Sequence, residues 1–315
     1  MSARRDRHAP PDRPVVPDGP SPVDLHTHTL RSDGILEPRA LVEQAAAAGV
    51  RLLAITDHDN LAAYHELTAS AAPALPDGID LIPGVEINCL TGNQPGVWEG
   101  ELHVLGFGIQ PDDGAFEDLL SRQRLGRRIR FDRTLEILRR AGLSVDAAAA
   151  RLDLSATESL GRPTVARLLI ASGHATSVED AFKRWLGRGC PAYVAREGIG
   201  PVRAITAIRA AGGLPVLAHF GEAEAHLSRI RDLQAVGLGG LEVYYRTFDP
   251  EHVQAVGRVA DELGLIKTGG SDFHGDTGSY AEVHASTWVP EVVGERLLNA
   301  LAQRADVVPA TVVPR

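Results

Sequence analysis

Two histidines separated by a single residue, His26 and His28, are the first side chains in the sequence with an evident chemical use. Residues 23–26 alternate apolar and polar side chains as a short strand does, so both rings should project from one side of an extended backbone. Neutral imidazole is the commonest ligand for zinc, manganese or iron, and Asp33, five residues further on, offers an oxygen ligand. Two surface histidines at a strand end would give the same pattern. The positions of the remaining histidines are therefore needed to distinguish a metal site from two surface residues.

The chain has 12 histidines, and half of them fall at or beside the ends of predicted strands. Three carboxylates, those of Asp33, Glu86 and Asp272, lie at corresponding positions beside predicted strand ends. Burying so many ligand-type side chains together without a counter-charge would be costly, so the set as a whole predicts bound metal. The expected ligands are His26, His28, Asp33, His58, Glu86, His103, His219, Asp272 and His274. The other histidines, His8, His65, His174, His226, His252 and His284, lie in the tail, on helices or in connections, where solvated or locally hydrogen-bonded rings are expected.

Seven apolar stretches that could position these ligands are predicted as strands. They are residues 23–26, 51–56, 79–85, 102–108, 214–218, 240–244 and 265–269. Glu86 follows the third stretch directly, while His103 stands near the start of the fourth. Strands separated by helices imply a parallel sheet, and a closed or nearly closed barrel brings seven strand ends round one mouth better than an open sheet does. The predicted fold class is therefore α/β, a TIM-like (β/α)7 barrel.

Residues 114–187 interrupt this alternation, because strand signals almost disappear there. Leucines and arginines recur at helical spacing instead, at Leu119, Arg122, Leu125, Ile129, Leu135 and Leu138. We therefore predict a helical insertion at 114–198 within a barrel formed by 23–113 and 199–300. Residues 1–22 are rich in proline and arginine, match neither a signal peptide nor a membrane span, and are predicted to form a disordered tail.

The composition limits the possible partners. Hydrophobic residues make up 44% of the chain, enough for a sizeable core. The net charge of -9 argues against a broad basic surface for double-stranded DNA, although a local arginine pocket for one phosphate remains compatible with it. With only Cys89 and Cys190 present, a disulfide framework is not expected and a reducing cytoplasm is the simpler assumption.

Several motifs, taken in order, resemble those of the PHP (polymerase and histidinol phosphatase) family. The resemblance covers about residues 23 to 280, and within the family it is strongest to the branch of nucleotide phosphatases and RNase AM, in which a helical domain interrupts the barrel. The matching barrel motifs are Asp24-Leu25-His26-Thr27-His28, Ser32-Asp33-Gly34, Ala54-Ile55-Thr56-Asp57-His58-Asp59, Pro83-Gly84-Val85-Glu86, Ala218-His219 and Gly270-Ser271-Asp272-Phe273-His274. The insertion contributes Arg127-x-x-Arg130, Gly161-Arg162-Pro163, Ala166-Arg167, Leu186-Gly187-Arg188-Gly189 and Ala192-Tyr193-Val194.

The resemblance implies a distorted seven-stranded barrel that holds two or three divalent transition metals, Mn, Fe or Zn. One metal would be bound by His26, His28, Glu86 and Asp272, a second by Glu86, His103 and His219, and a third by Asp33, His58 and His274. Two positions depart from the family pattern: Phe220 follows His219 where proline is common, and Thr164 stands where this branch often has histidine.

Phosphate ester hydrolysis is the chemistry that such a centre would perform. A hydroxide held between two cations forms near neutral pH and attacks phosphorus in line, while the cations neutralise the phosphoryl oxygens. Asp272, His219 and His274 are the candidate catalytic residues for proton transfer. Asp57 and Asp59 flank His58 and are predicted to orient its ring.

The insertion supplies candidate substrate contacts. Arginine forms bidentate hydrogen bonds to phosphate, so Arg127, Arg130 and Arg162 are predicted to clamp a second phosphate, with Arg167 a weaker candidate. A small nucleotide substrate with 3′ and 5′ phosphates, cleaved at the 3′-phosphate, fits this layout, as does a short RNA trimmed from its 5′ end. Tyr193, Tyr244 or Tyr245 could stack on a base, although packing is the commoner role.

Two alternatives stay open. A histidinol-phosphate phosphatase would use the same metal centre. Its small amino-alcohol substrate has only one phosphate, however, and needs no arginine clamp for a second one. A non-catalytic PHP module would serve binding only, yet such modules usually lose ligands and none is missing here.

Overall fold

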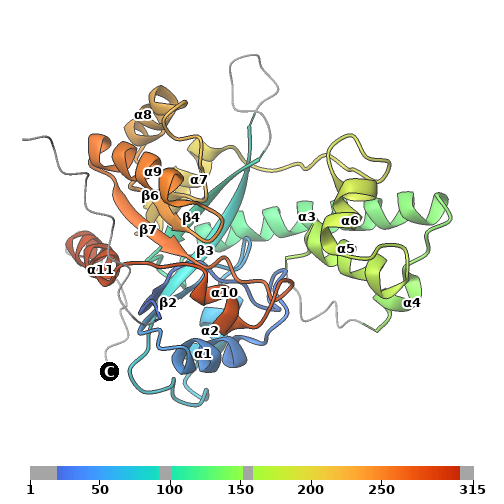
Figure 1. The fold of residues 1–315 in the computed structure, drawn as a ribbon, viewed down its shortest axis with the longest axis horizontal. Helices are drawn as coiled ribbons and strands as arrows, with labels where there is room; N and C mark the ends of the chain where they lie inside the picture. Colours follow the sequence, from blue (N-terminus) through green and yellow to red (C-terminus); the bar gives the residue numbers. More distant parts are fainter. Residues whose placement is uncertain (1–19, 92–100, 152–158, 306–315) are drawn as a thin grey trace, which may run out of the picture.

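The computed structural model describes residues 20–91, 101–151 and 159–305. Its centre is a single seven-stranded sheet in which the spatial order follows the chain order, β1-β2-β3-β4-β5-β6-β7 (Figure 1). The strands are β1 (Val23–Asp24), β2 (Leu52–Ile55), β3 (Asp80–Leu90), β4 (Glu101–Phe107), β5 (Leu214–Leu217), β6 (Gly240–Tyr245) and β7 (Ile266–Gly270). Each overlaps a predicted strand, so the predicted seven-stranded α/β barrel is confirmed.

The barrel is nearly closed, because the first and last strands lie side by side. The amide of Leu25 donates to the carbonyl of Gly269 at 3.1 Å, and the amide of Asp272 donates to the carbonyl of His26 at 2.7 Å. A parallel bridge between Thr27 and Phe273 continues the contact beyond the strand ends. The segments that carry His26 and Asp272 are therefore fixed to each other by backbone hydrogen bonds.

The expectation of an all-parallel sheet is wrong at β4. This strand runs antiparallel to both β3 and β5, while the other neighbouring pairs are parallel. Only residues 91–100 connect β3 to β4, which is shorter than the roughly dozen residues that a parallel crossover requires. The chain therefore reverses direction here.

β3 is longer than predicted and serves two neighbours. Its first four residues, Asp80 to Pro83, pair in parallel with β2, and the stretch from Gly84 to Leu90 pairs with β4. Glu86, expected just beyond the end of a strand, consequently lies within β3 at the point where the strand has left β2. It is 1% exposed.

Helices cover the outside of the barrel and close one end. They are α1 (Pro38–Ala47), α2 (Ala62–Thr68), α7 (Pro201–Ala210), α8 (Leu227–Ala235), α9 (Pro250–Leu263), α10 (Tyr280–Ala285) and α11 (Glu291–Ala305). α1, α7 and α9 each begin with proline, whose fixed φ suits a first helical turn. Val293, Leu297 and Leu301 of α11 pack with Val23 and Leu52, which lie at the starts of β1 and β2. That end of the barrel is thus filled, and the opposite rim is left for a site.

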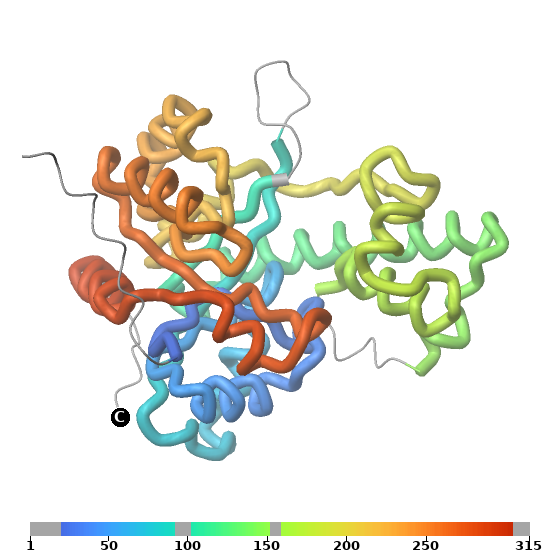
Figure 2. The backbone as a smooth tube through the Cα atoms, viewed as in Figure 1, coloured from blue at the N-terminus to red at the C-terminus, as the bar shows by residue number. Residues whose placement is uncertain are grey.

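Between β4 and α7 the described residues contain helices and no strand. These are α3 (Gly114–Arg140), α4 (Asp146–Ala149), α5 (Arg162–Ala171), α6 (Val178–Ala181) and the π-helix η1 (Phe182–Leu186). Figure 2 shows this part as a lobe beside the barrel, joined to it by α3 and by the returning segment. Phe116 and Leu120 of α3 belong to the barrel core, whereas Phe131 and Leu138 belong to the core of the lobe. One helix therefore spans both cores.

The helical stripe predicted for α3 differs from the buried face. Leu125 and Ile129 are 61% and 44% exposed, while Arg127 and Arg130 are only 4% and 9% exposed. The middle of α3 crosses the rim of the barrel, where a polar site lies beneath it, so the two arginines are buried there, while Leu125 and Ile129 face solvent.

The predicted tail, 1–22, lies outside the described residues up to residue 19. Its last residues belong to the barrel, since Ser21 is buried and donates its hydroxyl to the carbonyls of Val23 and Val289. Within the described part of the chain, no helix has the length and apolar character needed to cross a bilayer. Cys89 and Cys190 are both free thiols.

Candidate metal centre

The nine predicted metal ligands meet at the rim opposite α11. They come from β3 and β4 and from the segments that follow β1, β2, β5 and β7. Their donor atoms form three groups, and within each group the atoms lie within 4.8 Å of one another. The groups are His28, Asp33, His58 and His274; His26, His28 and Asp272; and Glu86, His103 and His219.

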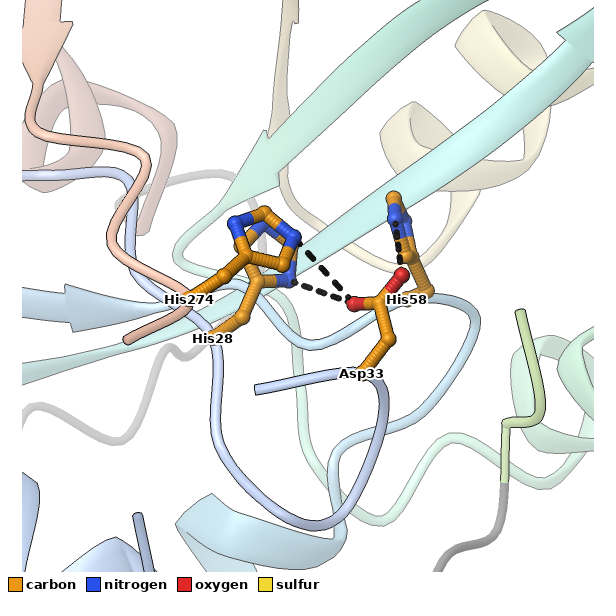
Figure 3. Close-up of side chains that lie close together, drawn as sticks. All are labelled: His28, Asp33, His58 and His274. Atoms are coloured by element: carbon orange, nitrogen blue, oxygen red, sulfur yellow. Dashed lines mark ion pairs between the residues drawn. The ribbon is translucent and has the colours of Figure 1, made fainter. Parts of the chain in front are cut away.

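The first group surrounds Asp33 (Figure 3). His274 Nε2 lies 3.3 Å and His28 Nδ1 lies 3.8 Å from Asp33 Oδ1. His58 Nε2 lies 3.5 Å from the other oxygen, Oδ2. Three imidazole nitrogens thus converge on one carboxylate that is 2% exposed.

The other two groups are joined by Glu86. Its Oε1 lies 2.5 Å from His103 Nδ1 and 3.3 Å from His219 Nε2. Its Oε2 lies 3.4 Å from His26 Nε2, 3.2 Å from His28 Nε2 and 3.0 Å from His58 Nδ1. One carboxylate therefore faces two sets of nitrogens with its two oxygens, as a bridging ligand would.

His28 is shared in a way that the sequence did not indicate. Its Nε2 lies 3.2 Å from Asp272 Oδ1, while its Nδ1 faces Asp33. The family resemblance implied a place for His28 only on the metal bound by His26, Glu86 and Asp272. In the structure it also belongs to the group around Asp33.

Unsatisfied nitrogen atoms test whether this donor set suits a cation. His26 Nε2, His28 Nε2 and His58 Nδ1 are buried and have no hydrogen-bond partner among the described residues. Carboxylate oxygens lie within 3.4 Å of each of them, but not in hydrogen-bonding geometry. Buried nitrogens left unpaired beside carboxylates are costly in a protein, whereas a cation between them would satisfy both. The residues present therefore fit bound metal.

The electrostatics follow from this crowding. Burial disfavours a charged His28, but Asp272 and Glu86 outweigh burial and raise its pKa to about 10. For His58 burial prevails and lowers the pKa to about 3. Burial alone would raise the pKa of Asp33, Glu86 and Asp272, yet the surrounding imidazoles hold the pKa of each carboxyl well below its usual range. The carboxylates are therefore ionised and ready to bind a cation.

The three predicted substrate-binding arginines line the same cavity as the donors. The cavity measures about 190 Å³. Its walls include Asp33, His58, Glu86, His103, His219, Asp272 and His274 from the barrel and Arg127, Arg130, Gly161, Arg162 and Phe182 from the helical lobe. The Arg162 guanidinium lies 5.4 Å from the centre of the Phe182 ring and 5.9 Å from that of Tyr193. The arginines and the candidate metal ligands thus face one cavity.

Comparisons with known proteins agree with this geometry. The family model described as PHP domain matches residues 24–151. The chain is 33% identical over 263 residues to a 3′,5′-nucleoside bisphosphate phosphatase of Chromobacterium violaceum, covering 80% of this chain and 87% of that protein. The chain belongs to the PHP family. It is also 35% identical over 261 residues to a 5′-3′ exoribonuclease of Haemophilus influenzae, covering 80% of this chain and 89% of that protein.

A solved structure extends the PHP likeness to the fold. A Bifidobacterium adolescentis protein assigned as a metal-dependent phosphoesterase superposes with a TM-score of 0.75 at 29% identity, covering 88% of this chain and 95% of that one. Like its relatives in the PHP family, the present chain is a metal-dependent phosphoesterase.

Glu242 is a residue of the PHP centre that the sequence analysis missed. It is 1% exposed, its Oε1 lies 2.9 Å from His26 Nδ1, and its Oε2 accepts the backbone amide of His219 at 2.7 Å. The ladder between β6 and β7 is irregular between Glu242 and Tyr244, as bulges beside active sites often are. A carboxylate inside the apolar stretch Gly240–Tyr245 was the available signal.

Asp57 and Asp59 of this PHP protein do not orient the ring of His58. Asp57 accepts hydrogen bonds from the Thr29 amide and from the hydroxyls of Thr29 and Ser32. It therefore holds the loop beside His28. Asp59 instead pairs with Arg127 and Arg196. The ring of His58 lies between Glu86 and Asp33.

Backbone strain gathers at the PHP centre. Among the described residues, the non-glycine residues with positive φ are Asp59, His219 and Asp272, at 53°, 34° and 47°. Each lies just after a strand at the ligand-bearing rim, and such conformations persist only where the surroundings enforce them. Hydrogen bonds to their backbones, such as the one that the Asp272 amide donates to the His26 carbonyl, stabilise these conformations.

The remaining predicted contacts have structural partners. Arg167 forms two hydrogen bonds to Asp276, at 2.7 and 2.5 Å, and so ties α5 to the segment after β7. The Tyr245 hydroxyl donates to Asp272 Oδ2 at 2.9 Å, and Tyr244 packs against the core. Phe220 also packs against the barrel core, and Thr164 is buried in α5. His284, one of the histidines expected to be solvated or locally hydrogen-bonded, is buried in α10, with its Nε2 2.8 Å from the Ser21 carbonyl oxygen.

Proposed function

We propose that this PHP phosphoesterase removes the 3′-phosphate of nucleoside 3′,5′-bisphosphates and trims short 5′-phosphorylated RNA from its 5′ end. The observation that carries the proposal is that Arg127, Arg130 and Arg162 share one cavity with the metal ligands. Two classes of phosphate-binding group in one space suit a substrate with two phosphates. The names of the Chromobacterium violaceum and Haemophilus influenzae relatives support the same two substrate classes.

Arg127 is the best-placed arginine for the phosphate that is not cleaved. Its Nε donates to Asp59 Oδ2 at 2.5 Å, which fixes the plane of the guanidinium. Its Nη2 is buried and has no hydrogen-bond partner in the part of the chain that the structure describes. An arginine held at one edge with an N–H group left over is preorganised for a phosphate oxygen.

Two or three cations, Mn, Fe or Zn, would be held by the nine donors. When bound, they supply an activated water near neutral pH and neutralise charge on the phosphoryl oxygens. Imidazole and carboxylate ligands suit each of these metals. His26, His28, Asp272 and Glu86 would form one site, Glu86, His103 and His219 a second, and Asp33, His58 and His274 a third, with His28 able to reach the third as well.

The candidate catalytic residues differ in their freedom to move a proton. Asp272 is held on one oxygen by Tyr245 and faces His26 and His28 with the other. His274 Nδ1 lies 3.0 Å from the Asp272 carbonyl, which leaves Nε2 toward Asp33. The His219 side chain is 26% exposed, compared with 12% for Asp272 and 18% for His274. His219 Nε2 faces Glu86 and His103 in the second metal site, so its Nδ1 would carry the proton. We assign proton exchange with the leaving group to His219 Nδ1, and orientation of the centre to Asp272 and His274.

A reducing cytoplasm, where nucleotides and RNA fragments occur, is the location that we propose. The two free cysteines suit it.

A phosphate-release screen tests the function. Purified protein supplied with manganese should release phosphate from adenosine 3′,5′-bisphosphate faster than from adenosine 3′-monophosphate, and should shorten 5′-phosphorylated oligoribonucleotides faster than 5′-hydroxyl ones. Faster release from histidinol phosphate would replace the proposal with the amino-alcohol phosphatase. Protein that remains inert although metal analysis finds bound manganese would favour a non-catalytic binding module.

A further inference from the structure

Asp59 connects the candidate metal centre to the arginines, which is a different role from the orientation of His58 predicted from its place in the sequence. Its side chain is completely buried. Arg127 Nε and Arg196 Nη2 donate to the same oxygen, Oδ2, at 2.5 and 3.0 Å. Arg124 Nη1 donates to the backbone carbonyl of Asp59 at 2.9 Å. Arginines from both chain segments that join the lobe to the barrel therefore meet at this one residue.

The backbone of Asp59 is fixed to the candidate metal centre. It directly follows His58, and its amide donates to the carbonyl of Glu86 at 3.0 Å. Both neighbours are predicted metal ligands. Its φ of 53° lies in the left-handed region, which residues other than glycine adopt infrequently, and the contacts on both sides hold it there. Any displacement of Asp59 would move the arginines relative to the metal ligands.

We infer that Asp59 is a positioning residue that sets the separation between the arginine clamp and the metal centre, and so selects substrates whose two phosphates are one nucleoside apart. The inference rests on the proposed function. Asp59 acts through Arg127, whose Nε it holds and whose Nη2 is left for phosphate. In a 3′,5′-bisphosphate the two ester oxygens are separated by three carbon atoms. Because the distance between the clamp and the metal centre is fixed, substrates with that separation would bind best.

A variant series tests the role of Asp59. Asn preserves its shape and tolerates a positive φ but removes the charge that holds two arginines, so Asp59→Asn should loosen the clamp. The ratio of kcat/KM for adenosine 3′,5′-bisphosphate to that for adenosine 3′-monophosphate should fall about 10-fold or more. In the Arg127→Ala background the same substitution should change this ratio less than about 2-fold, because the group through which Asp59 acts is gone.

Asp132→Asn is the matched control. It removes a carboxylate that pairs with an arginine on the same helix, but Asp132 is 56% exposed and Arg128 is 55% exposed. A purely structural role for Asp59 would lower the melting temperature and reduce turnover of both substrates equally. An unchanged ratio in Asp59→Asn, or an equal loss in the Arg127→Ala background, overturns the inference.

A second measurement uses the unmodified protein and does not depend on any variant folding. Linear alkanediol bisphosphates with two to six carbons between the ester oxygens should show a maximum of kcat/KM at three carbons. A profile that is flat with chain length overturns the inference even if adenosine 3′,5′-bisphosphate is hydrolysed well. Failure of the unmodified protein to hydrolyse any bisphosphate would instead overturn the proposed function, and the inference with it.

Discussion

His103 Nδ1 lies 2.5 Å from Glu86 Oε1, although the two residues lie on strands that run in opposite directions. His103 is the third residue of β4, and in a parallel strand that position would lie at the closed end of the barrel. Because β4 is antiparallel, its beginning lies at the same rim as the ends of the other strands. The reversal of one strand thus brings His103 into the set of predicted ligands.

Removal of a single predicted ligand should abolish turnover. Asp272→Asn and His26→Ala each take away a donor that faces His28 or Glu86. Since a metal supplies several kcal/mol of transition-state stabilisation, we expect a loss of about 1000-fold or more in kcat. Phosphate release from adenosine 3′,5′-bisphosphate measures it, together with metal analysis of each variant. His65→Ala, on the outer helix α2, is the control and should behave as the parent protein does.

Glu242 should contribute to manganese affinity and activity although it is not among the predicted ligands. It fixes His26 Nδ1 and the His219 amide, so Glu242→Gln weakens the orientation of two ligands at once. A loss of about 10- to 100-fold in manganese affinity or activity is expected. Titration of metal-free protein with manganese measures the affinity. Glu262→Gln, a surface carboxylate that pairs with Arg231, should leave it unaltered.

The arginine clamp should act only on substrates with the extra phosphate. Arg127→Ala and Arg130→Ala each remove a cation that lines the cavity, and a hydrogen bond to a charged group contributes about 1.5–3 kcal/mol. We expect kcat/KM for the 3′,5′-bisphosphate to fall about 10- to 100-fold, with a much smaller loss for the 3′-monophosphate. Arg128→Ala, which removes an exposed arginine of the same helix, should show neither loss. Equal losses on both substrates would contradict the clamp.

Gly161 packs against a predicted ligand, so even a methyl group should disturb the centre. A Cβ at this position would lie 2.9 Å from Asp33 Oδ2 and 3.1 Å from Pro163 Cδ. Crowding of this kind costs about 1–3 kcal/mol, and Gly161→Ala should therefore weaken the affinity of the group around Asp33 for manganese by about 10-fold. Gly114→Ala is the control, because no described atom lies within 4 Å of its added Cβ. Unchanged manganese stoichiometry and affinity in Gly161→Ala would show that Asp33 can move aside freely.

Metal binding should release protons. In the metal-free cluster the carboxylates of Asp272 and Glu86 outweigh burial and raise the pKa of His28 to about 10, so this ring is protonated at pH 7. A cation can bind its nitrogen only after the proton leaves, and the apparent affinity for manganese should therefore rise with pH between 6 and 8, by up to about 10-fold per unit for each proton displaced. Calorimetric titrations in two buffers with different heats of ionisation count the protons. Identical heats in both buffers would show that no proton is released.

The strands and the clustering of the nine candidate donors were predictable because both leave short-range patterns. Apolar stretches followed within two residues by His58 or His219 identify strand ends, and the family motifs identify their partners. The direction of β4 was missed since apolar composition is the same in either direction, and only the short connection from β3 constrains it. Asp59 was assigned to His58 by adjacency, but its partners Arg127 and Arg196 are distant in sequence. Contacts of that kind exist only once the fold has formed.

β1 and β7 are the first and last strands of the barrel, and they bring His26 and His28 beside Asp272. During synthesis the two histidines leave the ribosome long before the aspartate does. A nascent chain that lacks β7 therefore lacks one donor of this group. Any cation that the group binds can contact all three donors only after β7 has been made and has paired with the segment after β1, so assembly of the complete group depends on closure of the barrel.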